Sequence, residues 1–184
     1  MKLMSSAMKP LAELPAFTQL LTAFQNPILG VLAGLIITAI IQSSSASVGI
    51  LQAMALTKAV SVGAAIPIIM GQNIGTCITA LLSSIGVSKN ARKVAIVHVS
   101  FNLIGTAVCL VIYCVANGIW QFDFVNQPID AIGIAAIHTM FNVFTTILLL
   151  PFTKQLENIA NFILPDTSSK ELTNTNLLDP RLLA

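Results

Sequence analysis

The chain has 184 residues, of which 55% are hydrophobic and 9% are charged, and its mean hydropathy is +0.87. Because soluble domains carry about 25% charged residues, this composition excludes an ordinary soluble domain and predicts an all-α polytopic membrane protein. The formal net charge of +2, without a polybasic run, offers no surface suited to a nucleic acid. The cysteines lie in apolar blocks without metal-ligand spacing, so we expect small buried residues and no disulfide framework: Cys77, Cys109 and Cys114.

The stretch 14–57 is uncharged, and its most polar part is Gln-Ser-Ser-Ser-Ala-Ser at residues 42–47. Apolar arms at 30–41 and 48–56 flank these residues, and each arm is shorter than the roughly 20 residues that span a bilayer as a helix. Hydroxyl and carboxamide groups at hydrocarbon depth are costly unless they line a cavity or pair inside protein. The pattern therefore predicts the tip of a re-entrant hairpin or the break in a discontinuous helix, where carriers place binding sites.

A helix break at this position would expose backbone N–H groups and a partial positive charge, which suit a phosphate-like anion. We therefore expect anion binding by four residues that precede and begin the second arm: Gln42, Ser43, Ser44 and Ser45. Serines that bond only to the preceding turn of their own helix or to a neighbouring helix remain the alternative.

A second polar motif, Gly-Gln-Asn-Ile-Gly-Thr at residues 71–76, separates the short apolar segments 59–70 and 77–86. Glycines permit backbone turns that other residues avoid, so we expect carbonyls opened at Gly71 and Gly75 to bind sodium with the oxygens of Asn73 and Thr76. Neither motif contains a charged residue, so an anion would need co-bound cations, which is the logic of ion-coupled symport. Close helix packing by the glycines is the alternative interpretation.

Two later stretches, 94–115 and 131–150, are long and apolar enough to cross a bilayer, and each contains the pattern H-x-x-F-N. A histidine and an asparagine four residues apart share one helix face. The pattern predicts a shared packing or lining role for two pairs, His98 with Asn102 and His138 with Asn142.

The charge distribution orients the chain. The loop 117–130 is acidic and contains no lysine or arginine, whereas the basic residues at the opposite side are Lys89, Arg92, Lys93 and Lys154. By the positive-inside rule the basic side and the C-terminus are cytoplasmic, and Lys58 shares the external side with the loop if the first segment is a hairpin. We expect one membrane repeat over residues 1–163, opened by a weak helix at 1–25, and a polar tail at 164–184.

The two polar motifs and the two H-x-x-F-N spans resemble the sodium-dependent phosphate cotransporter family, which includes bacterial symporters and vertebrate renal relatives. The resemblance covers roughly residues 10–155. It implies sodium-coupled phosphate transport in a multi-pass cell-membrane protein, such as one of the bacterial inner membrane, with sodium as coupling ion and no other cofactor. By the same resemblance, phosphate or sodium would contact Gln42, Ser43, Ser44 and Ser45, with Asn73 and Thr76 contributing.

The family pattern contains two inverted repeats, each with its own Gln-Ser-Ser-Ser element, whereas this chain contains one and looks like the second repeat. We therefore expect half of a carrier, either a fragment that needs its other half or a chain that pairs with a second copy, and we favour the fragment. Two alternatives belong to other classes. One is an intramembrane serine hydrolase that uses His98 or His138 as base, and the other is a structural membrane subunit that does not transport.

Overall fold

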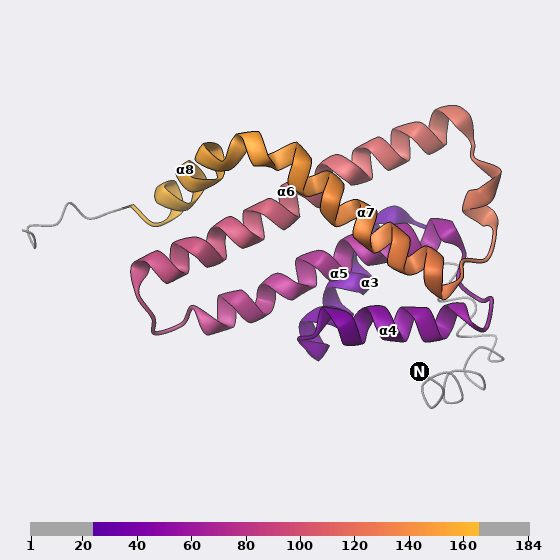
Figure 1. The fold of residues 1–184 in the computed structure, drawn as a ribbon, viewed down its shortest axis with the longest axis horizontal. Coiled ribbons are helices and arrows are strands. Elements are labelled where there is room, and N and C mark those ends of the chain that lie inside the picture. Colours follow the sequence, from indigo (N-terminus) through magenta and orange to yellow (C-terminus); the bar gives the residue numbers. More distant parts are fainter. Residues whose placement is uncertain (1–23, 166–184) are drawn as a thin grey trace, which may run out of the picture.

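The computed structural model describes residues 24–165, which form a bundle of helices, and Figure 1 shows their arrangement. The predicted all-α class is confirmed for this part of the chain. The predicted N-terminal helix (1–25) and polar tail (164–184) lie almost entirely outside the described residues. In chain order the α-helices are α3 (Pro27–Ile41), α4 (Ser44–Ala55), α5 (Val62–Ser83), α6 (Lys89–Trp120), α7 (Ala131–Leu149) and α8 (Thr153–Ile163), with 3-10 turns η1 (Asp123–Asn126) and η2 (Leu150–Phe152).

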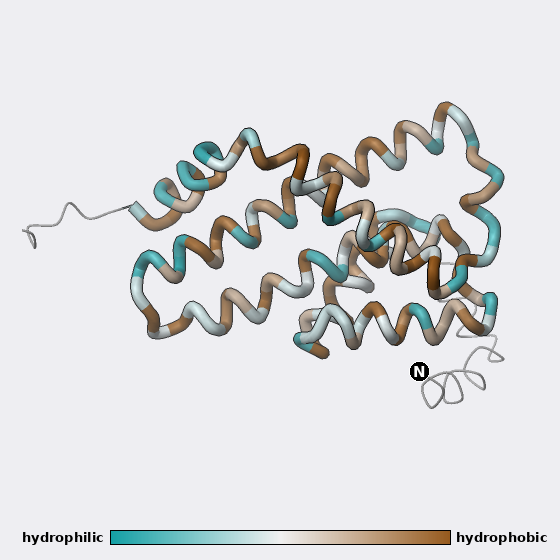
Figure 2. Tube along the Cα trace, viewed as in Figure 1, coloured by the Kyte–Doolittle hydropathy of each residue, from teal (hydrophilic) through white to brown (hydrophobic). Residues whose placement is uncertain are grey.

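Within residues 24–165, three helical stretches are long and apolar enough to cross a bilayer: Val62–Ser83, Lys89–Trp120 and Ala131–Ile163. The last combines α7 and α8, which η2 separates where Pro151 interrupts the chain. Figure 2 shows apolar residues distributed along α6 and α7, and many of these side chains are exposed, as expected for helices that face lipid. The two predicted spans, 94–115 and 131–150, are thus confirmed as helices, and the chain is a membrane protein.

Helix α5 contradicts the prediction of two short segments with a backbone break at residues 71–76. It is one continuous helix of 22 residues that contains Pro67 and both glycines of the motif. A helix that continues through residues 71–76 pairs the backbone groups that a turn in apolar surroundings would leave unpaired. The broken-helix prediction is therefore wrong at this position.

The glycines of α5 instead permit a close parallel crossing with α3. A Cβ on Gly71 would overlap the carbonyl oxygen of Val31, and one on Gly75 would lie 2.7 Å from the carbonyl oxygen of Leu35. Gly34 on α3 faces α5 in the same way, since its Cβ would overlap the Ile68 carbonyl oxygen. Small residues on both helices let the backbones touch, which is the packing alternative considered above.

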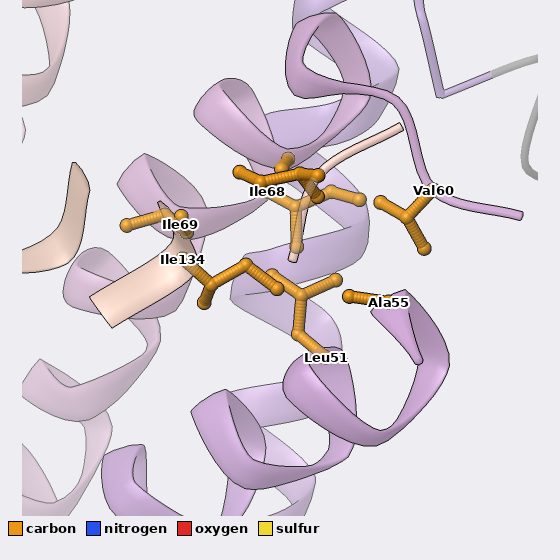
Figure 3. Packing of buried hydrophobic residues seen from close by; sticks show 8 residues of the cluster. Leu51, Ala55, Val60, Ile68, Ile69 and Ile134 are labelled. Carbon is orange, nitrogen blue, oxygen red and sulfur yellow. The ribbon is translucent and has the colours of Figure 1, made fainter. Parts of the chain in front are cut away.

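Helix α4 packs back against α5 and α7 through an apolar cluster. Figure 3 shows Leu51 and Ala55 of α4 beside Ile68 and Ile69 of α5 and beside Ile134 of α7. These side chains are 0–4% exposed, so this cluster is the best-enclosed apolar contact between the hairpin and the long helices. It fixes the side of the bundle on which α4 lies.

The hairpin of α3 and α4 begins and ends at one end of the molecule. Gln25, before α3, and Ser61, after α4, line the same pocket as Asn126 of the α6–α7 connection. The loop after α4 also bonds to this connection, because the Ile129 N–H donates to the Val60 carbonyl at 3.0 Å. At the other end, the Lys89 ammonium donates to the carbonyl of Pro165. The segment after α4 and the loop 117–130 therefore lie at the same end of the described bundle, and the membrane side that Lys58 and this loop face stays a prediction.

Candidate functional site

The chain reverses direction at Gln42 and Ser43. Gln42 has φ 57°, in the left-handed region, and its N–H donates to the Thr38 carbonyl at 2.7 Å, which closes α3. Ser43 is extended, with φ −143°, and its hydroxyl accepts from the N–H of Ala46 at 3.3 Å, which caps α4. The backbone break predicted between the two apolar arms is confirmed here.

The four predicted substrate-binding residues lie together at this tip. Ser43 Oγ and Ser45 Oγ are 3.3 Å apart, Ser43 and Ser44 are partly buried, and Gln42 and Ser45 are exposed. The backbone N–H groups of Ser44 and Ser45 belong to the first turn of α4, which has no intrahelical acceptor for them. Four consecutive residues therefore supply hydroxyls, a carboxamide and a helix N-terminus as uncharged hydrogen-bond donors, which is chemistry suited to an oxyanion.

The tip lies level with the middle of α5. Ser47, in the first turn of α4, accepts a hydrogen bond from the side chain of Gln72, which is in the middle of α5 (Val62–Ser83). Figure 1 shows the α3–α4 turn ending well short of the turn between α5 and α6. The polar groups of the tip are thus level with the centre of an apolar helix that is long enough to cross a bilayer.

The predicted sodium-binding residues divide into two groups. The carbonyls of Gly71 and Gly75 lie within the continuous helix α5 and are not opened by a turn. Asn73 Nδ2 donates to the Ile69 carbonyl at 2.9 Å, and Thr76 Oγ1 donates to the Asn73 carbonyl at 2.6 Å. Because these donors are used within α5, the side-chain oxygens of Asn73 and Thr76 keep their acceptor lone pairs.

The two H-x-x-F-N pairs make the same local bond. Asn102 Nδ2 donates to the His98 carbonyl at 3.0 Å, and Asn142 Nδ2 donates to the His138 carbonyl at 2.7 Å. Each asparagine therefore bonds to its own helix, and a lining role stays a prediction. Across residues 24–165, no hydrogen bond connects a histidine ring with Ser43, Ser44 or Ser45, so the structure gives the hydrolase alternative no support.

One buried cluster was not among the predicted site residues. Thr38 Oγ1 donates to Ser47 Oγ at 2.7 Å, and Gln72 Nε2 donates to the same oxygen at 2.9 Å. These three side chains come from α3, α4 and α5 and are 0%, 1% and 2% exposed, respectively. Their contact arises from the packing of three helices, so no local spacing could identify it. The available signals were the one polar side chain in the apolar arm 30–41, Thr38, and the membership of Ser47 and Gln72 in the two polar motifs.

The chain is similar to proteins of a known family. Residues 1–164 match the profile of the Na+/Pi-cotransporter family. The chain is 36% identical over 136 residues to the uncharacterized protein YqeW of Bacillus subtilis, a match that covers 73% of this chain and 43% of that protein. It is 42% identical over 91 residues to human sodium-dependent phosphate transport protein 2B, and 38% identical over 91 residues to the rat 2A protein.

The matches with the human and rat proteins cover 46% of this chain and 13% and 14% of the respective relatives. The chain thus spans less than half the length of each of these three relatives. No solved structure matches it. Since the family profile extends over most of its length, and since its paired polar motifs are those that first indicated the resemblance, this chain belongs to the Na+/Pi-cotransporter family.

Proposed function

We propose that the chain forms one half of a carrier that couples sodium entry to the transport of inorganic phosphate across the cell membrane. The observation that supports this most directly is the tip at Gln42–Ser45. There the chain breaks between two short helices and presents uncharged donors at mid-depth of a membrane helix. The names of the animal relatives, sodium-dependent phosphate transport proteins, support the same ion and substrate.

Phosphate would bind through hydrogen bonds rather than through a fixed positive charge. The helices α3, α4 and α5 contain no charged residue, and an uncompensated anion in low dielectric is strongly unfavourable. Backbone N–H groups and hydroxyls at the N-terminus of α4 supply partial positive charge. Cations that enter with phosphate would supply the remainder, which makes transport of the two ions interdependent.

Sodium would bind to side-chain oxygens of α5. Asn73 Oδ1 and Thr76 Oγ1 remain acceptors because their donor groups bond within the helix. Hard cations prefer such oxygen ligands, and Gly75, between the two residues, lies beside Thr38, one turn before the tip. The cation site would therefore lie next to the phosphate site.

A second half would complete the site. Gln42 and Ser45 are exposed, and polar groups in the middle of a bilayer need protein or a water-filled cavity around them. In our proposal α3 and α4 form a re-entrant hairpin, and a second repeat, in the same polypeptide or in a second copy of this chain, covers its tip. Movement of one repeat against the other would give alternating access. The basic end around Lys89 would face the cytoplasm together with the C-terminus.

The test is uptake of labelled phosphate by proteoliposomes that contain the purified carrier. We expect uptake with an inward sodium gradient, loss of uptake with an equal potassium gradient, and loss again when a sodium ionophore is added. Equal uptake with the two gradients would show that the carrier is not sodium-coupled. Absence of uptake under all conditions, in a folded and correctly assembled carrier, would favour a structural subunit.

A further inference from the structure

The hydroxyl of Ser47 accepts hydrogen bonds from Thr38 and Gln72, and this contact joins three helices just below the tip. We propose that Thr38, Ser47 and Gln72 are positioning residues that hold the tip in register with α5 and thereby set the affinity for phosphate and sodium. This inference rests on the function proposed above. None of the three residues is proposed to touch either ion.

The position of the cluster supports this role. Thr38 lies four residues before Gln42, and Ser47 lies four residues after Ser43, so each is one helical turn from the break. The backbone carbonyl of Thr38 also accepts the N–H of Gln42 that ends α3. A shift of this cluster would therefore move both sides of the tip.

The chemistry of the cluster differs from that of the other contacts between α4 and α5. Leu51 and Ala55 meet Ile68 and Ile69 through apolar surfaces, and apolar attraction is non-directional. Hydrogen bonds require defined distances and angles, so the bonds to Ser47 oppose sliding of α4 along α5. The cluster thus supplies the directional contact between the helix that begins the phosphate site and the helix that carries the proposed sodium ligands.

A second feature of Gln72, its unpaired side-chain oxygen, indicates a role beyond folding. Its Oε1 is buried and has no hydrogen-bond partner within residues 24–165. An unpaired buried carbonyl costs folding free energy, whereas an apolar residue of similar shape would remove this cost together with the bond to Ser47. The substitution Gln72→Leu should therefore remove the positioning contact while leaving the thermal stability nearly unchanged, and this separates positioning from structural support.

The experiment measures phosphate uptake as a function of phosphate and of sodium concentration for three variants: Thr38→Val, Ser47→Ala and Gln72→Leu. We expect KM for phosphate to rise about fivefold in each, the factor equivalent to about 1 kcal/mol, or one neutral hydrogen bond. KM does not depend on how much folded carrier is present, so a merely structural role would lower the maximal rate and leave KM unchanged.

Two control variants match the chemistry of the test variants. Thr79→Val removes a hydroxyl that bonds within α5, to the Thr76 carbonyl, and Gln52→Leu removes an interhelical carboxamide bond at the far end of α4, to the Ala131 carbonyl. We expect both controls to keep the wild-type KM. Thr38→Ser, which keeps the hydroxyl and loses the methyl group, should restore most of the affinity lost in Thr38→Val.

A second measurement does not require transport. Hydrogen–deuterium exchange of the same purified preparations should become faster in peptides that cover α3 and α4 of the three variants, while α6 and α7 keep wild-type exchange. Unchanged KM with unchanged exchange would overturn the proposal. Loss of sodium activation in Gln72→Leu, with normal sodium activation in Thr38→Val and Ser47→Ala, would also overturn the proposal, because Gln72 would then be an ion ligand. If the wild-type carrier does not transport phosphate, the proposed function fails, and the exchange data alone decide whether the cluster holds the tip.

Discussion

The two polar motifs of this chain lie in similar surroundings, but one interrupts a helix and the other does not. Residues 42–47 and 71–76 are both uncharged, both lie in apolar surroundings, and both were expected to interrupt a helix. The first ends α3 and begins α4, whereas the second lies inside the continuous helix α5. Polar residues in an apolar run therefore do not by themselves identify a backbone break.

The difference follows from capping and packing. At the first motif, Ser43 Oγ accepts the Ala46 N–H, so a side chain replaces a lost backbone bond and makes a new helix start favourable. At the second motif, Gly71 and Gly75 are four residues apart, on one face of α5, and the backbone of α3 covers that face. Glycine could adopt a turn at both positions. Here Gly71 and Gly75 stay helical, because the close contact with the α3 backbone requires their small size.

The largest effect is expected from filling the crossing of α3 and α5. A Cβ on Gly71 would overlap the Val31 carbonyl oxygen, which is backbone and cannot move aside as a flexible side chain would. We therefore expect Gly71→Ala to lower the free energy of unfolding by at least about 3 kcal/mol. Thermal unfolding of the purified protein in detergent measures this.

Gly118→Ala is the matched control on α6, because a Cβ at Gly118 meets nothing within 4 Å. Alanine is the better helix former, so this variant should be as stable as the wild type or more stable by roughly 0.5–1 kcal/mol. Equal melting temperatures for Gly71→Ala and wild type would contradict the packing role of the second motif.

The next effect concerns the tip. Removing the hydroxyl in Ser44→Ala should raise KM for phosphate roughly 30-fold, the factor for about 2 kcal/mol in a hydrogen bond to a charged group. Stability should change little, because Ser43 and not Ser44 caps α4. Thr146→Val, which removes a hydroxyl that bonds within α7, is the control and should transport normally. An unchanged KM in Ser44→Ala would remove this hydroxyl from the phosphate site.

A smaller effect tests whether the second motif binds sodium in addition to packing. Thr76→Val keeps the side-chain shape and removes Oγ1, so the sodium concentration for half-maximal uptake should rise about fivefold, equivalent to about 1 kcal/mol. The maximal rate at saturating sodium should stay near the wild-type value, since α5 remains intact. If sodium activation is unchanged, the oxygen of Thr76 serves only its bond to the Asn73 carbonyl.

The sequence predicted the features that depend on local chemistry. The length of the apolar stretches predicted α6 and α7. The polar residues from Gln42 to Ser45 predicted the break between α3 and α4, because a serine cap depends only on residues within one helical turn. The continuity of α5 was missed because it depends on α3, which lies about 40 residues earlier. The contact of Thr38 and Gln72 with Ser47 was missed for the same reason. Tertiary packing decided both features, and single-sequence patterns do not contain it.

The smallest effects are expected from the two H-x-x-F-N pairs, which make the same bond in different surroundings. Asn102 is 6% exposed, whereas Asn142 is only partly buried. Each donates to the carbonyl four residues earlier, so replacement by leucine of similar size removes this bond and leaves no charge unpaired. We expect Asn102→Leu to cost about 1 kcal/mol of unfolding free energy and Asn142→Leu about 0.5 kcal/mol or less. Thermal unfolding measures both.

The transport rates of these two variants then show whether Asn102 and Asn142 only stabilise their helices or also line the ion pathway. If the asparagines serve only their own helices, uptake per folded carrier should equal the wild-type value in Asn102→Leu and in Asn142→Leu. A large loss of uptake in Asn142→Leu without a loss of stability would place the partly buried face of α7 against the second half of the carrier or its ion pathway. In the first of these two cases the second half would contact α7 as well as the tip of α3 and α4.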